Sequence, residues 1–253
     1  MTKRGDAPPF NNEDAILALG ARLEKTTRAP GLTLAGEHLT LDLCGGLWLA
    51  AHRTLVVSDL HLEKGSAFAA RSGQFLPPYD TRETLACLHE VVARLDPARV
   101  VALGDSFHDA RGPDRMEPGD RAMVAALQEG RDWVWIAGNH DHAVTEGVGG
   151  RYAETLTVGG LTLRHEPSPE AEDGEVSGHL HPCGKVAMRG RAVRRRCFVT
   201  DGRRLVMPAF GAYAGGLNVR NAAFEPLFPT GFTAHLLGDG RVFAIGKGML
   251  SKD

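Results

Sequence analysis

Residues 81–105 read TRETLACLHEVVARLDPARVVALGD, a helix-spaced stretch followed by a short apolar run. Apolar residues recur at helical spacing from Thr81 to Leu95, and Asp96-Pro97 ends the predicted helix. The run Arg99–Leu103 has the length and apolar character of a buried strand, and Gly104-Asp105 follows it. A helix that leads directly into a buried strand favours an α/β fold.

The same alternation of helix and strand continues on both sides of this stretch. The sequence predicts a second helix from Glu117 to Glu129 and a second buried strand from Trp133 to Ala137. Upstream, residues 31–57 alternate apolar and polar positions, which predicts two or three paired strands. Because sites in open α/β sheets usually lie at the carboxyl ends of the strands, we expect functional residues at that edge.

After Tyr152 the pattern changes to strands without long helices. Asp201-Gly202 and Asp239-Gly240 each lie between alternating apolar residues, which predicts two hairpins. We therefore expect a second sheet that packs against the first through a shared core. Residues 29–253 are predicted to form one domain, and residues 1–28, which are polar, a loosely ordered leader.

The composition is that of an ordinary soluble globular protein, with 43% hydrophobic and 24% charged residues. A formal net charge of -2 provides no global field to recruit nucleic acid, so such binding requires a local basic patch. The four cysteines form no CxxC pair, and we expect reduced thiols. No apolar run approaches the ~18 residues of a membrane span, and we expect a cytoplasmic protein without a membrane partner.

Five short blocks of His, Asp and Asn residues each follow a predicted strand. They are SDLH at 58–61, GDSFH at 104–108, GNHD at 138–141, His165 after LTLR, and GHLH at 178–181. Residues two apart on a strand point to the same face, so Asp59 and His61 are expected to grip one ion together. The same rule places His179 and His181 on one face.

Taken together, the blocks predict a metal centre. A single block is more often a helix cap or a turn, but five blocks at strand ends are poorly explained by coincidence. Imidazole mixed with carboxylate and amide oxygen suits Mn, Fe or Zn, whereas Mg prefers mostly oxygen. We expect two divalent metal ions, Mn before Fe, Zn or Mg, with these ligands: Asp59, His61, Asp105, Asn139, His165, His179 and His181.

In this order the blocks resemble the pattern D-x-H, GD-x-x-[DH], GNH-[DE], H and GH-x-H of the calcineurin-like metallophosphoesterase superfamily. The resemblance implies a four-layer αββα fold, in which two packed sheets are flanked by helices. It implies that one ion is held by Asp59, His61, Asp105 and His181. It implies that the other is held by Asp105, Asn139, His165 and His179, so that Asp105 is shared.

The chain is more narrowly similar to the bacterial ligase-associated DNA damage response endonuclease and phosphodiesterase subfamily, PdeM. The segments that carry this similarity are SDLHLEKGSAFAARSGQFLPPYDTRETL at 58–85, ALGDSFHD at 102–109, AGNHD at 137–141, LRHEP, SGHLHP and LVMPAFGAYAGGLNV at 205–219. The similarity implies a DNA endonuclease that acts in DNA repair, with a ligase, helicase or exonuclease group as partners. His142 stands where we expect Pro or a similar residue after GNHD, and it has no interpretation.

The chemistry expected of such a centre is hydrolysis of phosphodiesters. Two ions about 3.5–4 Å apart clamp a phosphoryl group and activate a bridging water to hydroxide for attack. His140 lies beside Asn139 and outside both ligand sets, so it is placed to protonate the leaving alkoxide, with Asp141 orienting it. His108 either lines the pocket as an extra donor or bonds a nearby carbonyl.

Seven arginines crowd into one predicted hairpin after the last block: Arg189, Arg191, Arg194, Arg195, Arg196, Arg203 and Arg204. One interpretation is that Arg194, Arg195 and Arg196 bind the DNA backbone. The other is a solvated face balanced by the acidic stretch 166–175. The Gly-rich stretch 210–216 lacks the GxxxxGK[ST] spacing and is expected to be structural.

The alternatives to a DNA endonuclease are a phosphomonoesterase or phosphoprotein phosphatase of the same fold, and a repair scaffold without turnover. The complete ligand set and His140 favour an enzyme over a scaffold.

Overall fold

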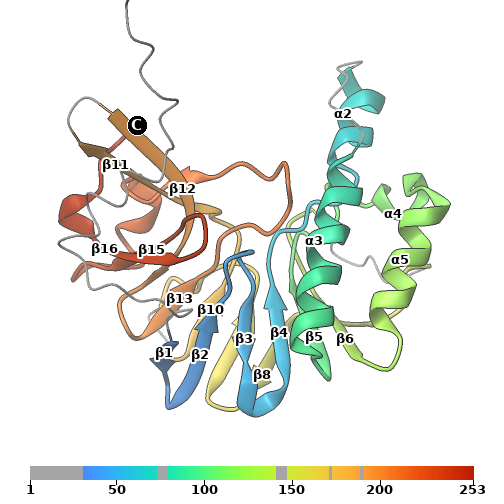
Figure 1. Cartoon of the computed structure of the whole chain (residues 1–253), viewed down its shortest axis with the longest axis horizontal. Coiled ribbons are helices and arrows are strands. Elements are labelled where there is room, and N and C mark those ends of the chain that lie inside the picture. The colour runs from blue at the N-terminus through green and yellow to red at the C-terminus, as the bar shows by residue number, and fades with distance from the viewer. Residues whose placement is uncertain (1–30, 73–78, 141–146, 171–172, 189–190) are drawn as a thin grey trace, which may run out of the picture.

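Two β-sheets packed face to face form the centre of the molecule (Figure 1). The computed structural model describes these residues: 31–72, 79–140, 147–170, 173–188 and 191–253. The predicted leader, residues 1–28, lies outside the described residues. The α/β class and the two packed sheets predicted from the sequence are confirmed.

The first sheet has seven strands that follow one another in sequence order. They are β1 (Gly31–Leu34), β2 (Glu37–Leu41), β3 (Leu47–Leu49), β4 (Thr54–Val57), β5 (Arg99–Leu103), β6 (Asp132–Ile136) and β7 (Arg151–Ala153). Strands β1 to β4 form an antiparallel meander, one strand more than the two or three predicted. Strands β4 to β7 are parallel, so the carboxyl ends of β4, β5 and β6 meet at one edge.

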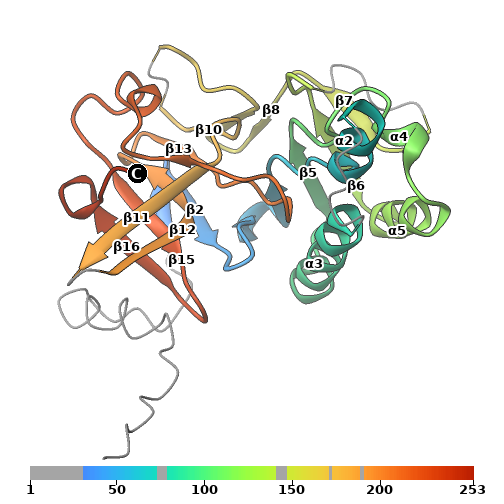
Figure 2. The same cartoon turned by 90° about the horizontal axis from the view of Figure 1, so that it is seen from above.

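The α-helices of the described chain lie on the outer face of this sheet, beside β5 and β6 (Figures 1 and 2). They are α2 (Lys64–Ser72), α3 (Asp80–Leu95), α4 (Gly112–Arg115) and α5 (Pro118–Gln128). Helix α3 ends where predicted because Asp96 turns left-handed and its N–H bonds the Val92 carbonyl. In the described part of the chain, no helix combines the length and the apolar character needed to cross a bilayer.

The second sheet has nine strands and contains both predicted hairpins. They are β8 (Thr155–Val158), β9 (Leu161–Arg164), β10 (Glu175–Ser177), β11 (Pro182–Met188), β12 (Arg191–Thr200), β13 (Arg204–Val206), β14 (Leu217–Asn218), β15 (Thr233–Leu237) and β16 (Val242–Gly246). Asp201-Gly202 connects β12 to β13 and Asp239-Gly240 connects β15 to β16, both antiparallel. Strands β9 and β10 are parallel, so their carboxyl ends also share an edge.

Apolar side chains from both sheets form the shared core. On β5, Val101 points toward the second sheet, whereas Val100 and Ala102 pack under the helices. Phe198 on β12 faces the same inter-sheet core from the other side. Because β5 is covered on both faces, it reads as a continuous apolar run in the sequence.

The far face of the second sheet packs against two short 3₁₀ helices and the segments around them. These helices are η2 (Ala222–Phe224) and η3 (Lys247–Met249), and a third, η1 (Ala50–His52), precedes β4. Phe224 is among the buried side chains of this outer layer. The four cysteines carry free thiols.

Candidate metal centre

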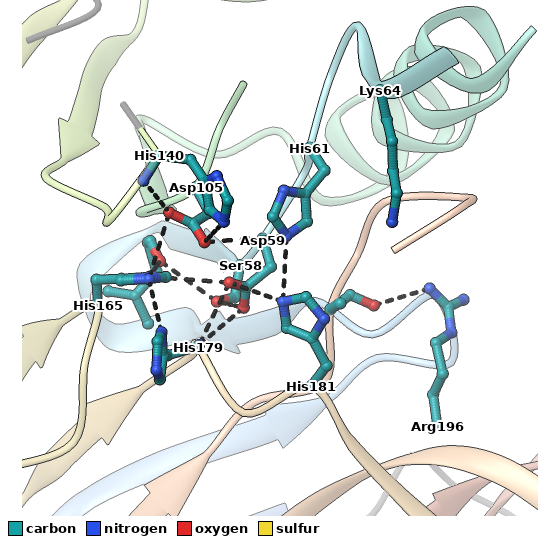
Figure 3. A network of polar contacts seen from close by, with 12 residues as sticks. Ser58, Asp59, His61, Lys64, Asp105, His140, His165, His179, His181 and Arg196 are labelled. Atoms are coloured by element: carbon teal, nitrogen blue, oxygen red, sulfur yellow. Dashed lines mark hydrogen bonds and ion pairs between the residues drawn. The ribbon is translucent and has the colours of Figure 1, made fainter. Parts of the chain in front are cut away.

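Six of the seven predicted ligand residues meet where the strand ends of both sheets face each other (Figure 3). Asp59 and His61 follow β4, Asp105 follows β5, and Asn139 follows β6. From the second sheet, His165 follows β9, while His179 and His181 lie between β10 and β11. The two sheets therefore supply opposite walls of one site.

Six of these side chains form two groups that could each hold a cation. Within each group the candidate ligand atoms all lie within 4.8 Å of one another. The first group contains Asp59, His61 and His181, and the second contains Asp105, His165 and His179. Strand-face reasoning puts His179 and His181 together, but they lie in different groups, which is the division that the family resemblance implies.

Asp105 lies between the two groups and faces both. Its Oδ2 is 3.9 Å from His61 Nε2, and its Oδ1 is 3.4 Å from His165 Nε2. One oxygen is therefore directed toward each group. This is the placement that a carboxylate shared by two ions requires.

The backbone of the site is unusual, because five candidate ligands have left-handed backbone angles. They are Asp59, His61, Asp105, His179 and His181, with φ between 45° and 68°. Our prediction placed both i, i+2 pairs on strand faces, and that reasoning was wrong, since neither pair lies in a strand. Left-handed non-glycine residues cost about 1–3 kcal/mol each and concentrate at functional sites.

Backbone hydrogen bonds between the loops after β4 and β5 hold this conformation. The Asp59 N–H donates to the Gly104 carbonyl (3.2 Å), and the His61 N–H donates to the Asp105 carbonyl (2.9 Å). A Cβ atom on Gly104 would overlap the His165 ring, and φ at Gly104 is +72°. Only glycine meets both requirements at this position.

The Gly-rich stretch 210–216, predicted to be structural, packs directly on the first ligand block. The Phe210 N–H donates to the Ser58 carbonyl (2.7 Å), and the Gly211 N–H donates to the Asp59 carbonyl (3.2 Å). The Ser58 hydroxyl in turn donates to Asp59 Oδ2 (2.6 Å). This stretch therefore holds the backbone that presents Asp59.

Two cations fix the same stretch from the side of His61 and His181 (Figure 3). Lys64 Nζ donates to the Tyr213 carbonyl (2.8 Å). Arg196 Nη1 donates to the carbonyls of Ala209 (2.9 Å) and Phe210 (3.1 Å). Their positive charges lie on one flank of the site, away from His165.

The carboxylates of the site are held ionised. Although burial favours the neutral acid, the hydrogen bond and charge of His165 and the N–H of His140 lower the pKa of Asp105 well below its usual range. Burial also favours the neutral acid at Asp59, but interactions with His181 and His165 outweigh burial, so the pKa of Asp59 is lowered as well. Ionised carboxylates are ready to coordinate a cation.

The imidazoles behave differently in the two groups. Burial lowers the pKa of His61 to about 4, despite the nearby carboxylates, so this ring is neutral. Burial disfavours the protonated form of His165 as well, but Asp105 and Asp59 raise the pKa of His165 to about 9. His165 Nδ1 faces the Leu103 carbonyl (3.0 Å) and must donate to it, which leaves Nε2 to face the second group. A cation in that group competes with the Nε2 proton.

The donor set fits divalent cations. His61 Nε2 lies 3.2 Å from His181 Nε2, which is itself 3.2 Å from Asp59 Oδ1. In the second group, His179 Nδ1 lies 3.3 Å from His165 Nε2. Two imidazole nitrogens and a carboxylate oxygen this close together can all coordinate one cation. A set of nitrogen and oxygen ligands without thiolate suits Mn, Fe or Zn.

His140 stands beside the centre but belongs to neither group. Its backbone N–H donates to Asp105 Oδ1 (3.0 Å), while its ring Nε2 is 3.9 Å from Asp105 Oδ2. The side chain is 49% exposed, so a substrate can reach it. Asp141, predicted to orient His140, lies outside the described residues.

His108 is the middle ring of an aromatic stack at the edge of the site. Its ring centroid lies 5.5 Å from that of His140 with an interplanar angle of 17°, and 5.5 Å from that of Phe68. Stacking on His140 is a role that neither expectation from the sequence included. The contact restricts the ring plane of His140.

The arginines predicted as one basic patch do not lie on one face. On β12, alternation places Arg194 and Arg196 on one side and Arg195 on the other. Arg203 Nε pairs with Asp173 (2.6 Å). Arg204 is buried at 1% exposure, with Nη1 3.5 Å from a Glu175 carboxylate oxygen. The balancing acidic stretch therefore accounts for Arg203 and Arg204, and Arg189 lies outside the described residues.

A cavity of about 460 Å³ adjoins the second group. Asn139 and His165 line it, which places Asn139 beside the group to which it was predicted to contribute. The sequence analysis missed the other side chains of its wall, among them Tyr152, Glu154 and Arg164. Arg164 directly precedes His165 in the sequence, which is the one local signal available.

Comparison with known proteins gives a family and a structural neighbour. Residues 52–189 match the family described as calcineurin-like phosphoesterase. The crystal structure of the Pseudomonas putida nuclease MPE is 28% identical, with a TM-score of 0.66 over 85% of this chain and 99% of that one. A predicted phosphoesterase from Streptococcus pneumoniae is 14% identical, with a TM-score of 0.29 over 77% of this chain and 97% of that one. No curated protein matches the chain.

Proposed function

The chain belongs to the calcineurin-like phosphoesterase family, and from this premise we propose that it is a binuclear metal-dependent phosphodiesterase acting on DNA. The observation that carries the proposal is the position of Asp105, with one oxygen directed toward each ligand group. The similarity to a solved nuclease at 28% identity supports a nucleic-acid substrate.

The bound ions would supply Lewis acidity at the phosphoryl oxygens and lower the pKa of an attacking water. The residues of the chain would hold and position these ions. Asp59, His61 and His181 would hold one ion, and His165 and His179 would hold the other, with Asp105 shared between them. Asn139 would add a neutral oxygen to the second position.

His140 serves the leaving group in this proposal. A phosphodiester releases an alkoxide, and a proton or a strong hydrogen bond from a positioned imidazole lowers the barrier to that release. His140 is held over Asp105 by its backbone and by its stack on His108, while its ring stays open to solvent.

The finer parts of the proposal come from the sequence. The resemblance implies endonucleolytic cleavage during DNA repair and a ligase, helicase or exonuclease group as partners. A cytoplasmic location is expected from the apolar pattern of the sequence, and Mn as the first metal is expected from the types of ligand. The imidazole-rich donor set supports Mn, Fe or Zn over Mg.

Removal of metal should abolish hydrolysis. Protein dialysed against a chelator should lose activity on bis(p-nitrophenyl) phosphate and on single-stranded DNA, because side chains alone cannot activate water sufficiently. Adding Mn²⁺ should restore both activities, and metal content by plasma mass spectrometry should rise to about two ions per chain.

Two outcomes would contradict the proposal. Hydrolysis that persists in the chelator would argue against metal chemistry. Faster turnover of p-nitrophenyl phosphate, a monoester, than of either diester would identify a phosphomonoesterase instead.

Changing Arg194 to Ala should weaken DNA binding and lower its log-log salt slope by up to about one unit, as expected for one lost phosphate contact. Arg194 shares a strand face with Arg196, which lies next to the centre. Fluorescence anisotropy at several salt concentrations measures both quantities.

Arg195→Ala provides the matched control for this measurement. Arg195 is adjacent in sequence and carries the same charge, but it lies on the opposite face of β12. Equal slopes for both variants and the unmodified protein would show that DNA does not cross the face of Arg194.

A further inference from the structure

The cavity next to Asn139 and His165 lies where the edges of the two sheets meet. Strand β7 ends the first sheet at Ala153, and β8 begins the second sheet at Thr155, so Glu154 alone connects them. The cavity extends from this crossing to the second ligand group. A molecule held on both ion positions would thus have one substituent directed into it.

The charge of this cavity does not suit a phosphate. Glu154 and Glu166 are exposed on its wall, and the other charged side chain of the wall outside the ligand groups is Arg164. Arg164 Nη1 lies 3.6 Å from an oxygen of the fully buried Glu175. Glu175 also pairs with Arg204, and the Arg164 side chain is 32% exposed, so Arg164 keeps part of its charge at the wall. Two exposed carboxylates against this one guanidinium leave the wall net negative, which disfavours an anionic group and attracts hydrogen-bond donors.

The opposite flank has the reverse character. Lys64 and Arg196 lie on the side of His61 and His181 (Figure 3). Glu154 and Glu166 line the cavity beside His165. The centre thus has one cationic and one acidic side. A strand that continues through further phosphates is favoured on the cationic side.

Resting on the proposed function, we infer that this cavity binds the uncharged part of one nucleoside, its base and sugar, beside the phosphate to be cleaved. Tyr152 lines the cavity and is half-buried against the core under the helices, and an aromatic side chain at this place can stack on a base. Glu154 and Glu166 accept hydrogen bonds from sugar hydroxyl or base N–H groups. The next phosphate beyond that nucleoside is disfavoured by the same carboxylates, so the inferred site favours cleavage beside the last nucleoside of a strand and departs there from the endonucleolytic cleavage that the resemblance implies.

Two esters with the same leaving group test the inference. The p-nitrophenyl ester of thymidine 5′-phosphate carries a nucleoside, and methyl p-nitrophenyl phosphate carries a methyl group in its place. With Mn²⁺-loaded protein, kcat/KM should be higher for the thymidine ester. Tyr152→Ala should lower the ratio of the two kcat/KM values about 5- to 100-fold through lost stacking, and Tyr152→Phe should retain it.

The carboxylates are tested by adding a phosphate to the 3′ hydroxyl of the thymidine ester. This addition should lower kcat/KM, and the double variant Glu154→Gln, Glu166→Gln should reduce that penalty at least about threefold. Both side chains are exposed, so folding does not depend on them. The double variant therefore tests the inference even if Tyr152→Ala fails to fold.

The outcomes separate the inference from the proposed function. If neither ester is hydrolysed, the proposed function fails. The nucleoside site is overturned, and the proposed function stands, in either of two cases. In the first, both esters are hydrolysed equally well and Tyr152→Ala leaves the ratio of their kcat/KM values unchanged. In the second, the added phosphate lowers kcat/KM by the same factor with and without Glu154 and Glu166.

Discussion

Replacing Asp105 with Asn should lower kcat on a phosphodiester by about 10³-fold or more, the largest effect expected of any single change. Asp105 is the carboxylate that faces both ligand groups, so a neutral amide weakens both ion positions at once. An amide oxygen can still accept the His140 N–H, so the loop should keep its conformation. Steady-state kinetics and metal content check the two effects together.

The matched control is Asp132→Asn. Asp132 begins β6, at the opposite end of the strand from the centre, and pairs with Arg99 and Arg151. Exposed pairs of this kind contribute about 0.2–1 kcal/mol to the free energy of unfolding, so activity should be retained. A fully active Asp105→Asn protein with its normal metal content would falsify the assignment of the site.

The second large effect should come from His140→Gln. If His140 protonates the leaving oxygen, kcat on DNA, which has a poor leaving group, should fall about 10²- to 10⁴-fold. A p-nitrophenyl diester needs no such proton and should lose far less. Metal content should stay normal, since His140 belongs to neither ligand group.

His52→Gln serves as the histidine control, because His52, the last residue of η1, pairs with Glu37 of β2, away from the centre. Rate measurements on DNA and on the nitrophenyl ester, made on both variants, test whether His140 acts on the leaving group. Equal losses on both substrates, accompanied by loss of metal, would make His140 a ligand or a structural residue.

The fold was largely predictable from local patterns. The helix after Thr81 and the apolar runs of β5 and β6 follow directly from spacing, because both faces of these parallel strands are buried. The two Asp-Gly hairpins were readable because that dipeptide accepts the turn conformation. The pairing of β12 with β15 was not, since it depends on contacts distant in sequence.

Six of the seven predicted ligand residues lie together in the candidate site, but their geometry was not predictable from the sequence. Strand-face reasoning put Asp59 and His61 together for the wrong reason, since their left-handed backbone depends on hydrogen bonds to the loop after β5. His179 and His181, two apart in sequence, contribute to different groups. Tertiary hydrogen bonds of this kind leave no periodic trace in the sequence.

The arginine hairpin shows a related limit. The alternation of side chains along a strand is enough to separate Arg195 from Arg194 and Arg196. No local pattern, however, indicates that Arg204 is buried against Glu175, because that pairing joins β13 to β10. Charge density in a sequence is therefore a weak guide to a binding surface.

Each ligand group takes side chains from both sheets, Asp59 with His181 in one and Asp105 with His165 in the other. A cation bound by either group would therefore cross-link the two sheets, and it would have to dissociate before the chain could unfold. Binding restricted to the folded chain adds about 2.7 kcal/mol to the free energy of unfolding when free metal is about 100 times Kd. A chain that binds metal in this way would resist proteolysis longer when divalent metal is plentiful, because less of it would be unfolded.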